Sequence, residues 1–349
     1  MNIPYRTRRA LNRLGIVALA FLLVLIITWF CWVVWLERYV VYTRDGAVLD
    51  LEISANTLTG EVAVPPNANT SSVSIYYNEG ENAIETQAEL SQMAGYYVTV
   101  DDLLADLNAV REQLIALPNG TPVMLEVKSR YGYFYYPSEI DGVHFSSTVN
   151  VEEVGKLISE LKMRGLYLIA KVPAFRDYLY GLNNVSSGLP VKGGYLWMDD
   201  QGYYWLKPKD AGTMGFLTSI ILELKELGFH EVVLGDFQFP ASDRIVYSGD
   251  KQADIISAAE TLVSSCSSTY FAVSFVAADA TFQLPQGRTR MYLENVNAQN
   301  VGYTANQVNL TDPKIQLVFL ASTNDTRYNE YSVLRPLSSA QELEAQNAK

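Results

Sequence analysis

The sequence predicts an α/β protein: a (β/α)8 barrel of the TIM type, irregular in its last third, preceded by one transmembrane helix. Two observations predict the barrel. About eight apolar strand segments follow residue 93, and amphipathic helical segments alternate with them through the first two-thirds. A long uncharged run near the N-terminus predicts the membrane helix. An open doubly wound sheet is the alternative that the same alternation allows.

The uncharged run is GIVALAFLLVLIITWFCWVVWL, residues 15–36. In a helix it would reach about 33 Å, enough to cross a hydrocarbon core of roughly 30 Å. Four arginines precede it, and the opposite charges of Glu37 and Arg38 directly after it sum to zero. The positive-inside rule therefore predicts a cytoplasmic N-terminus and an extracytoplasmic main domain. A cleaved signal peptide is the alternative, because residues 18–20 resemble a cleavage tripeptide. That tripeptide lies early in the run, which favours a single-pass anchor in the cell membrane.

The chain is expected to have five segments. They are a basic cytoplasmic tail (1–14), the anchor in the lipid bilayer (15–36), short strands with a polar stalk (37–92), the barrel (93–336) and a C-terminal tail (337–349). In the third segment, two short strands flank Arg44-Asp45-Gly46, a hairpin-type turn signal. A stretch rich in Asn, Ser, Thr, Glu and Pro follows, which is typical of a loosely packed stalk.

The barrel strands are expected as short apolar runs, several of them continuous because both faces of the strand are covered. In order they are AGYYVTV (94–100), PVMLEVK (122–128), LYLIAKV (166–172), EVVLGDF (231–237), YFAVSFV (270–276), RMYLENV (290–296), IQLVFLAS (315–322) and YSVLRP (331–336). Helices are expected between the earlier strands, over residues 102–117, 151–165, 214–228 and 253–266. A long insertion follows the third strand.

Composition excludes several classes of function. The net charge of -12 and a pI near 4.7 argue against a nucleic-acid partner, whose phosphates such a surface would repel. Two cysteines without a CxxC motif or a Cys/His cluster indicate neither a disulfide framework nor a metal site. Only two histidines occur, and no GxSxG, GxGxxG or GxxxxGK[ST] motif follows a strand. No cofactor or metal is therefore expected.

The active face of a barrel lies where its strands end. There Asp236 is the candidate nucleophile or stabiliser, with Glu294 or Asp279 as the acid. Solvated loop positions are the structural alternative for Asp279 and Glu294, and Asp101 and Asp102 suit a helix N-terminus better than catalysis.

Two lysines near the strand ends are further candidates. Glu126 and Lys128 stand two residues apart and share a strand face, so an ordinary ion pair between them is the alternative to a role in binding. Lys171 lies within an otherwise apolar strand and needs a carboxylate or a ligand near it, because an unpaired buried charge is costly.

Aromatic side chains crowd two predicted loops, YGYFYYP (131–137) and GGYLWMDDQGYYWLKP (193–208). Flat rings with a polar edge suit the apolar faces and the hydroxyls of sugars. Packing over the barrel mouth, or contact with a partner protein, is the alternative. The expected binding residues are Glu126, Lys128, Tyr131, Tyr136, Lys171, Asp177, Trp197, Trp205 and Gln238.

Four segments occur in an order that resembles a known family. They are PVMLEVKSRYGYFYY, LYLIAKVPAFRD, WMDDQGYYWLKP and GFHEVVLGDFQFP. Together they are similar to the glycoside hydrolase-like (β/α)8 barrel family of exported and membrane-anchored bacterial proteins, itself distantly similar to the α-amylase clan. The resemblance covers about residues 120–280 and implies a barrel that acts on or binds carbohydrate.

The departures from that family concern its carboxylates. The resemblance places an aspartate at Gly235 and another carboxylate at Val276, and Asp236 stands one residue further along. A one-residue offset turns a strand side chain to the opposite face, so Asp236 can substitute only where the strand end is bulged or twisted. Glycoside hydrolysis usually takes two carboxylates. The binding shell therefore looks better preserved than the chemistry.

Three functions follow as hypotheses. The first is a membrane-anchored, extracytoplasmic protein that binds carbohydrate or a cell-wall glycan with weak or no hydrolytic activity. The second is an active glycosidase that uses Asp236 with Glu294 or Asp279. The third is an envelope scaffold whose barrel mouth binds another protein.

Overall fold

The computed structural model describes residues 90–278 and 281–340, with a few positions nearer the N-terminus. The chain divides into two compact units, Met1–Tyr76 and Tyr77–Lys349. In the first, β1 (Val40–Thr43) and β2 (Gly46–Leu49) pair in antiparallel fashion, which confirms the predicted hairpin.

The anchor expected over 15–36 and the stalk that follows β2 fall largely or wholly outside the described residues, as does the tail after residue 340. Where the structure is described, none of the helices combines the length and the apolar character needed to cross a bilayer.

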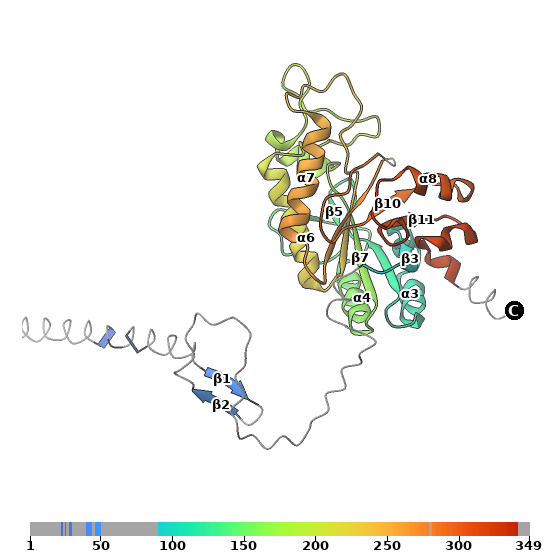
Figure 1. The fold of residues 1–349 in the computed structure, drawn as a ribbon. Coiled ribbons are helices and arrows are strands. Elements are labelled where there is room, and N and C mark those ends of the chain that lie inside the picture. The colour runs from blue at the N-terminus through green and yellow to red at the C-terminus, as the bar shows by residue number, and fades with distance from the viewer. Residues whose placement is uncertain are drawn as a thin grey trace, which may run out of the picture. The chain divides into compact units, whose positions relative to one another are not determined.

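Eight parallel strands close into a barrel in the second unit (Figure 1). All eight expected strands are confirmed. They are β3 (Ala94–Val98), β4 (Pro122–Glu126), β7 (Tyr167–Pro173), β8 (Glu231–Gly235), β9 (Ala272–Val276), β10 (Met291–Glu294), β11 (Leu317–Leu320) and β12 (Ser332–Pro336). The last strand pairs with the first, with Val333 opposite Ala94, so the open doubly wound sheet is excluded.

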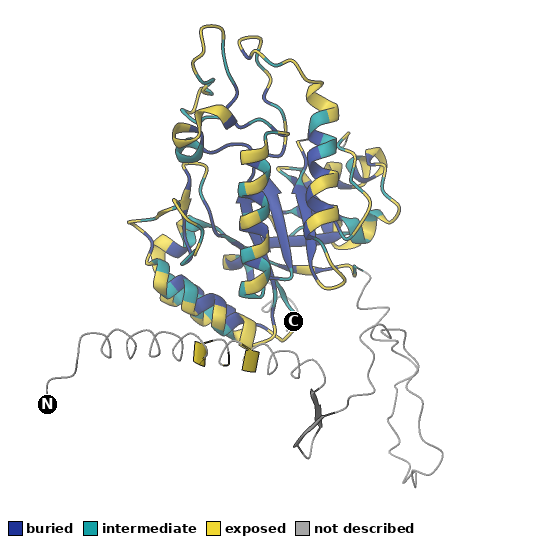
Figure 2. Ribbon diagram, turned by 90° about the vertical axis from the view of Figure 1, so that its left-hand side faces the viewer, coloured by how far each residue is buried: buried dark blue, intermediate teal, exposed yellow. Residues whose placement is uncertain are grey.

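Four long helices cover the first half of the barrel. They are α3 (Val100–Ala116), α4 (Val151–Met163), α6 (Ala211–Leu227) and α7 (Lys251–Cys266). Three begin two or three residues before the predicted starts, because polar caps precede them. Thr99 and Asp102 form a capping box at α3, which confirms that Asp102 serves the helix terminus. In Figure 2 the strands are buried, and the helices turn exposed faces outward.

The last third of the barrel is irregular, as predicted. Among the described residues between β9 and β10, none is helical. The connections around β11 hold only short helices: η2 (Ala298–Asn300), α8 (Val301–Gln307), α9 (Pro313–Gln316) and η3 (Thr326–Glu330), with η4 (Leu337–Ser339) after β12. The loops after β4 and β7 instead carry β5 (Tyr133–Phe134), β6 (His144–Phe145), α5 (Tyr178–Asn183) and η1 (Val185–Ser187).

Alternate strand residues fill the barrel interior in layers. The middle layer is apolar and includes Met124, Ile169, Val233, Tyr292, Val318 and Leu334. Two residues further toward the carboxyl ends of β4 and β7, the inward-facing side chains are Glu126, after Met124, and Lys171, after Ile169. The same two-residue period therefore aims charged side chains at the carboxyl-end mouth of the barrel.

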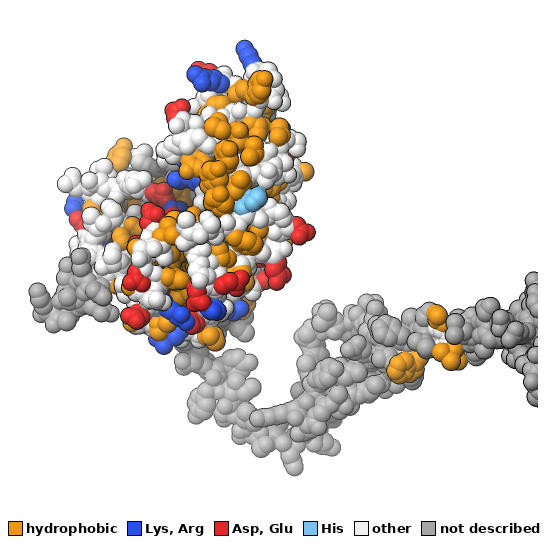
Figure 3. Space-filling view, turned by 180° about the vertical axis from the view of Figure 1, so that it is seen from behind, with side chains coloured by type: hydrophobic (Ala, Val, Ile, Leu, Met, Phe, Trp, Pro, Cys, Tyr) orange, Lys and Arg blue, Asp and Glu red, His pale blue; other side chains and the backbone are white. Residues whose placement is uncertain are grey.

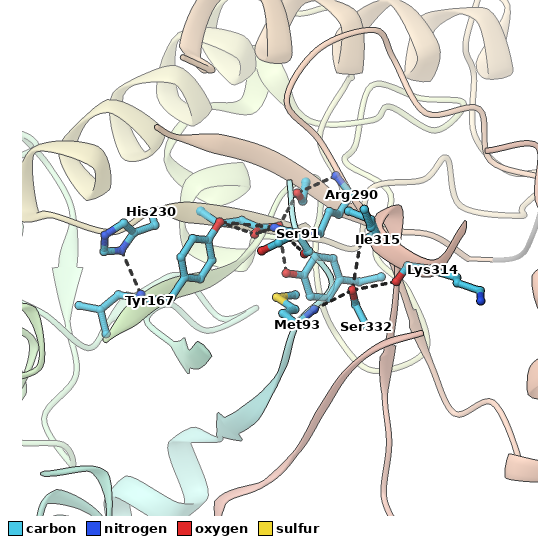
Figure 4. Close-up of polar contacts among 12 residues, drawn as sticks. Ser91, Met93, Tyr167, His230, Arg290, Lys314, Ile315 and Ser332 are labelled. Carbon is cyan, nitrogen blue, oxygen red and sulfur yellow. Dashed lines mark hydrogen bonds and ion pairs between the residues drawn. The ribbon is translucent and has the colours of Figure 1, made fainter. Parts of the chain in front are cut away.

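A polar network closes the opposite end of the barrel (Figure 4). Glu231, fully buried on β8, forms an ion pair with Arg290 at 2.5 Å and accepts hydrogen bonds from Ser274 at 2.6 Å and Tyr292 at 2.9 Å. Burial opposes the charge of Arg290, but Glu231 outweighs burial and raises the pKa of the guanidinium. Because Arg290 precedes β10 and Glu231 begins β8, the pair links strands that lie on either side of β9.

His230 lies directly before β8, and a hydrogen bond accepted by its ring favours the neutral imidazole. Its Nδ1 accepts a hydrogen bond from the Leu168 backbone N–H at 3.1 Å, and its ring stacks on Tyr167 (Figure 4). Burial, with help from Arg288 and Lys162, lowers the pKa of His230 below its ordinary value of 6.5.

The lowered pKa of His230 predicts a loss of stability on mild acidification. In the unfolded chain His230 binds a proton below about pH 6.5, whereas in the folded chain it does so only at lower pH. The stabilisation from the neutral imidazole is therefore complete above about pH 6.5 and is lost as the pH falls through the folded pKa. Denaturant unfolding from pH 7 to pH 5.5 should show a falling free energy of unfolding. In His230→Asn, which keeps an acceptor near Nδ1, the fall should be shallower. His230→Ala should be less stable at every pH, and equal slopes in wild type and His230→Asn would contradict the assignment.

Candidate functional site

Lys171 bridges two carboxylates at the barrel mouth. Its Nζ lies 3.2 Å from Oε1 of Glu126 on β4 and 2.7 Å from Oε1 of Glu294 on β10. Because both oxygens contact the same nitrogen, they lie no more than about 6 Å apart. The second oxygen of Glu126 accepts the backbone N–H of Val100 at 3.2 Å, which ties the group to the start of α3. The predicted partner of Lys171 is therefore not one carboxylate but two.

The Glu126–Lys171–Glu294 triad keeps the lysine charged. Burial of the ammonium opposes its charge, but Glu294 and Glu126 outweigh burial and raise the pKa of Lys171. A lysine nucleophile or general base needs a neutral amine, so this arrangement does not prepare Lys171 for either role. The lysine serves as a fixed cation between two strands.

Asp236 points its carboxylate into the mouth through an unusual backbone turn. It directly follows the last residue of β8 and has a φ of 48°, in the left-handed region that few residues other than glycine adopt. Its Oδ2 accepts from Nε of Arg130 at 2.7 Å, and Oδ1 lies 3.9 Å from Arg176. The strand end is thus twisted at Asp236, as a substitute for the missing aspartate would require, and its carboxylate is paired with Arg130.

Arg176 fastens the loop over residues 193–208 to the barrel. Its guanidinium forms an ion pair with Asp199, and its Cζ lies 4.7 Å from the centre of the Tyr203 ring and 5.6 Å from that of Trp205. Burial opposes the charge of Asp199, but hydrogen bonds from Trp205 and the backbone of Tyr203, with Arg176, lower its pKa. These contacts fix Tyr203 at the mouth.

Lys128 and Asp177 form a separate ion pair whose side chains are each 1% exposed. The ordinary pairing of Lys128 with Glu126 that the strand pattern allowed does not occur. Asp177 also accepts from the backbone N–H of Tyr180 and so caps α5. This pair anchors the loops beneath the mouth, and direct contact with a ligand would require these side chains to become exposed.

The aromatic residues divide into rim and core. Tyr131 and Tyr133 are exposed, and the rings of Tyr133, Tyr131, Tyr178 and Tyr204 stack in a row with centroids 4.6 to 5.3 Å apart. Both faces of each inner ring are covered by neighbouring rings, so a ligand would meet mainly the ring edges and hydroxyl groups of this row. It suits hydrogen bonding to a sugar better than stacking on one.

Three predicted binding aromatics lie away from the opening. Tyr136 is fully buried and donates to Glu223 at 2.6 Å. Trp205 is buried and donates from its indole to Asp199 at 2.9 Å, and Trp197 packs against Trp205 at a centroid distance of 6.3 Å. These rings hold the loops in place.

A cleft of about 660 Å³ opens above the triad. Its lining contains three carboxylates, those of Glu126, Asp236 and Glu294, and each of them is ion-paired. Gly235 and Val276, where the family resemblance places carboxylates, also line the cleft and carry none. In Figure 3 acidic and basic side chains meet in a hollow beside a broad area of hydrophobic side chains.

The structure gathers most of the predicted mouth residues in the lining of this cleft: Glu126, Lys128, Lys171, Asp236, Gln238, Glu294 and Tyr131, with the side chain of Lys128 almost wholly buried. Asp279 lies outside the described residues. The sequence did not single out Tyr135, Tyr203 or Asn295, which also line the cleft. Their only signal was their place directly after strands or within an aromatic loop. Among the described residues, no group of three or more His, Cys, Asp or Glu side chains could hold a metal ion.

Comparison with known proteins places the chain among glycosyl hydrolase domains. The family model described as "Putative glycosyl hydrolase domain" (DUF4015) matches residues 95–282, more than half of the 349 residues. No curated protein matches the sequence.

Similar solved structures include a hypothetical protein from Ruminiclostridium thermocellum, with 18% identity and a TM-score of 0.43 over 56% of this chain and 96% of that one. An alpha-galactosidase from Lactobacillus brevis has 10% identity and a TM-score of 0.52 over 74% of this chain and 39% of that one. The galactosidase domain of an alpha-galactosidase-sucrose kinase has 9% identity and a TM-score of 0.50, over 74% and 40%. The chain thus spans about two-fifths of each galactosidase, and these likenesses show the barrel fold alone.

Removing the cation of the triad should destabilise the barrel. In Lys171→Met two carboxylates would face each other unpaired, and we expect a loss of about 1–2 kcal/mol in the free energy of unfolding. The loss is smaller than for a fully buried pair because Glu126 and Glu294 remain 29% and 31% exposed. Chemical denaturation measures it. The matched control is Lys156→Met, which breaks an exposed pair with Glu153 on α4 and should leave the midpoint unchanged. A Lys171→Met protein as stable as the control would contradict the account.

Proposed function

The chain belongs to the family described as "Putative glycosyl hydrolase domain", and on that premise we propose that its barrel mouth binds carbohydrate with weak or no hydrolytic activity. One observation carries the proposal: each of the three carboxylates lining the cleft is ion-paired to a lysine or an arginine. Membrane anchoring through residues 15–36, an extracytoplasmic location and a cell-wall glycan as ligand are part of the same proposal and follow from the sequence.

The position of Lys171 argues against efficient hydrolysis. A glycosidase needs one carboxyl group to protonate the leaving oxygen and a second to act as nucleophile or base across the same bond. Lys171 occupies the space between Glu126 and Glu294, where that bond would have to lie. The carboxylate of Asp236 is likewise occupied, by an ion pair with Arg130.

The polar groups around the cleft support binding. The lining also includes side chains that carry hydroxyl or amide groups, namely Tyr131, Tyr135, Tyr203, Gln238 and Asn295, beside the charged groups. Sugar hydroxyls both donate and accept, so such a mixed set of donors and acceptors suits them. A scaffold that binds protein would be favoured by a shallow aromatic patch without convergent polar groups, which differs from this cleft.

Hydrolysis is the second candidate, and one distance favours it. Their contacts with Lys171 limit the distance between the Glu126 and Glu294 oxygens to about 6 Å, a limit that includes the separation of about 5–5.5 Å in a retaining pair. This pair differs from the Asp236 pairs that the sequence suggested. Activity would require the ligand to displace Lys171 from between the two groups.

Calorimetric titration with cell-wall and other oligosaccharides tests the proposal. The full chain would be held in a detergent without a sugar headgroup, and the sugars would be recovered and analysed for cleavage. We expect binding of intact sugar. Glu294→Gln should weaken it about tenfold by removing a charged acceptor, whereas Glu260→Gln, on the exposed face of α7, should not change it. Turnover at rates ordinary for enzymes, about 1 s⁻¹ or more, would refute the proposal. So would the absence of binding to every glycan.

Placing a carboxylate at Gly235 tests whether its absence there limits hydrolysis. A Cβ built there would meet only Val172 O at 3.8 Å and Lys171 Cε at 4.0 Å, so the site has room for a side chain. We expect Gly235→Asp to fold with a thermal midpoint near that of the wild type and to cleave a bound glycan faster than the wild type. Gly235→Asn adds the same bulk without charge and should show no gain. Equal cleavage by the two variants would show that the lost carboxylate does not limit the reaction.

A further inference from the structure

We infer that the mouth binds an internal stretch of an extended glycan that crosses Lys171, rather than a single sugar or a chain end. The inference rests on the proposed function and adds the class of ligand to it. It is carried by the shape of the mouth, which continues past the triad on both sides.

A second cleft, of about 550 Å³, adjoins the first. Both clefts are lined by Glu126, Lys171, Glu294 and Asn295, so the triad lies at their junction. Glu126 and Lys171 come from the neighbouring strands β4 and β7, whereas Glu294 comes from β10, three strands beyond β7 in the closed barrel, so the triad reaches across the mouth. The two clefts are therefore halves of one groove that runs across the mouth, and the triad forms its middle.

The size of the groove favours several linked sugars over a single sugar as the natural ligand. Pockets of about 300–1,000 Å³ hold drug-sized ligands, and each half alone falls in this range. One sugar ring is smaller than such a ligand and would leave most of the groove hydrated. Several linked rings are needed to fill both halves. Because the triad is flanked on both sides, the segment above it lies inside the chain of sugars.

The two halves differ in chemistry, which would give the bound glycan one direction. The first half is bordered by tyrosines, including Tyr131 and Tyr203, and by Arg130. The second half carries small polar side chains from the loops after β10 and β11, among them Asn297, Ser322 and Thr323. The second half also includes the rings of Tyr97 and Tyr328 and the ion pair of Asp325 with Arg327. The two halves therefore arrange their rings, charges and small polar groups differently and would contact successive sugars differently.

The test is a length series. Oligosaccharides of one to six units, prepared from each of several cell-wall and other polysaccharides, would be titrated by calorimetry beside the intact polymer. We expect affinity to rise at least tenfold between two units and the length that fills the groove, and then to level off. At equal concentration of sugar units, the polymer should bind at least as well as the longest oligomer.

Thr323→Val, which replaces one hydroxyl in the second half, should weaken the longest oligomer about three- to tenfold and leave the shortest that binds unchanged. Thr261→Val, on the exposed face of α7, is the matched control and should alter neither. Equal affinity for one unit and six would overturn the inference and leave the proposed function standing, as would polymer that fails to bind while its oligomers do. Failure of every length, polymer included, would overturn both.

Discussion

Neutralising charge inside a closed barrel is the constraint on which this structure depends. A charged side chain that enters the barrel loses hydration, so its partner must lie within the same barrel. At one end Glu231 is paired with Arg290 and accepts three further hydrogen bonds, from Tyr167, Ser274 and Tyr292. At the other end Lys171 is paired with Glu126 and Glu294. An apolar layer separates the two networks. Both networks join distant strands, so the electrostatics and the closure of the barrel stabilise each other.

The same constraint limits the chemistry at the mouth. Carboxylates that neutralise a fixed cation cannot at the same time serve freely as an acid and a nucleophile across a glycosidic bond. Asp236 illustrates the point, because its left-handed backbone brings it to the mouth and Arg130 then occupies its carboxylate. What remains available is a groove with many hydroxyls, amides and fixed charges, which suits recognition of sugars. Family membership and the geometry of the cleft thus support the same proposal from independent observations.

The fold was largely predictable from the sequence, and the site only in part. All eight strands follow from local apolar runs, and the need of Lys171 for a carboxylate follows from its apolar surroundings. The identity of its partners does not, because Glu126 and Glu294 are 45 and 123 residues away. Glu126 meets Lys171 through the register of β4 with β7, and Glu294 meets it through the fold of the barrel. The direction of Asp236 depends on a single φ angle that no periodicity encodes. The sequence shows where the aromatic residues lie along the chain. It does not show which of them are buried, because the burial of Tyr136 and Trp205 depends on tertiary packing.

A structure of the chain with an oligosaccharide bound at the mouth would test the central claim most directly. We expect an uncleaved glycan lying across Lys171, with the ammonium of Lys171 still within hydrogen-bonding distance of both Glu126 and Glu294. It would be contradicted by a cleaved or covalently attached sugar with Lys171 displaced and one of the two carboxylates turned to the glycosidic oxygen. A glycan bound elsewhere, with the cleft unused, would contradict it equally.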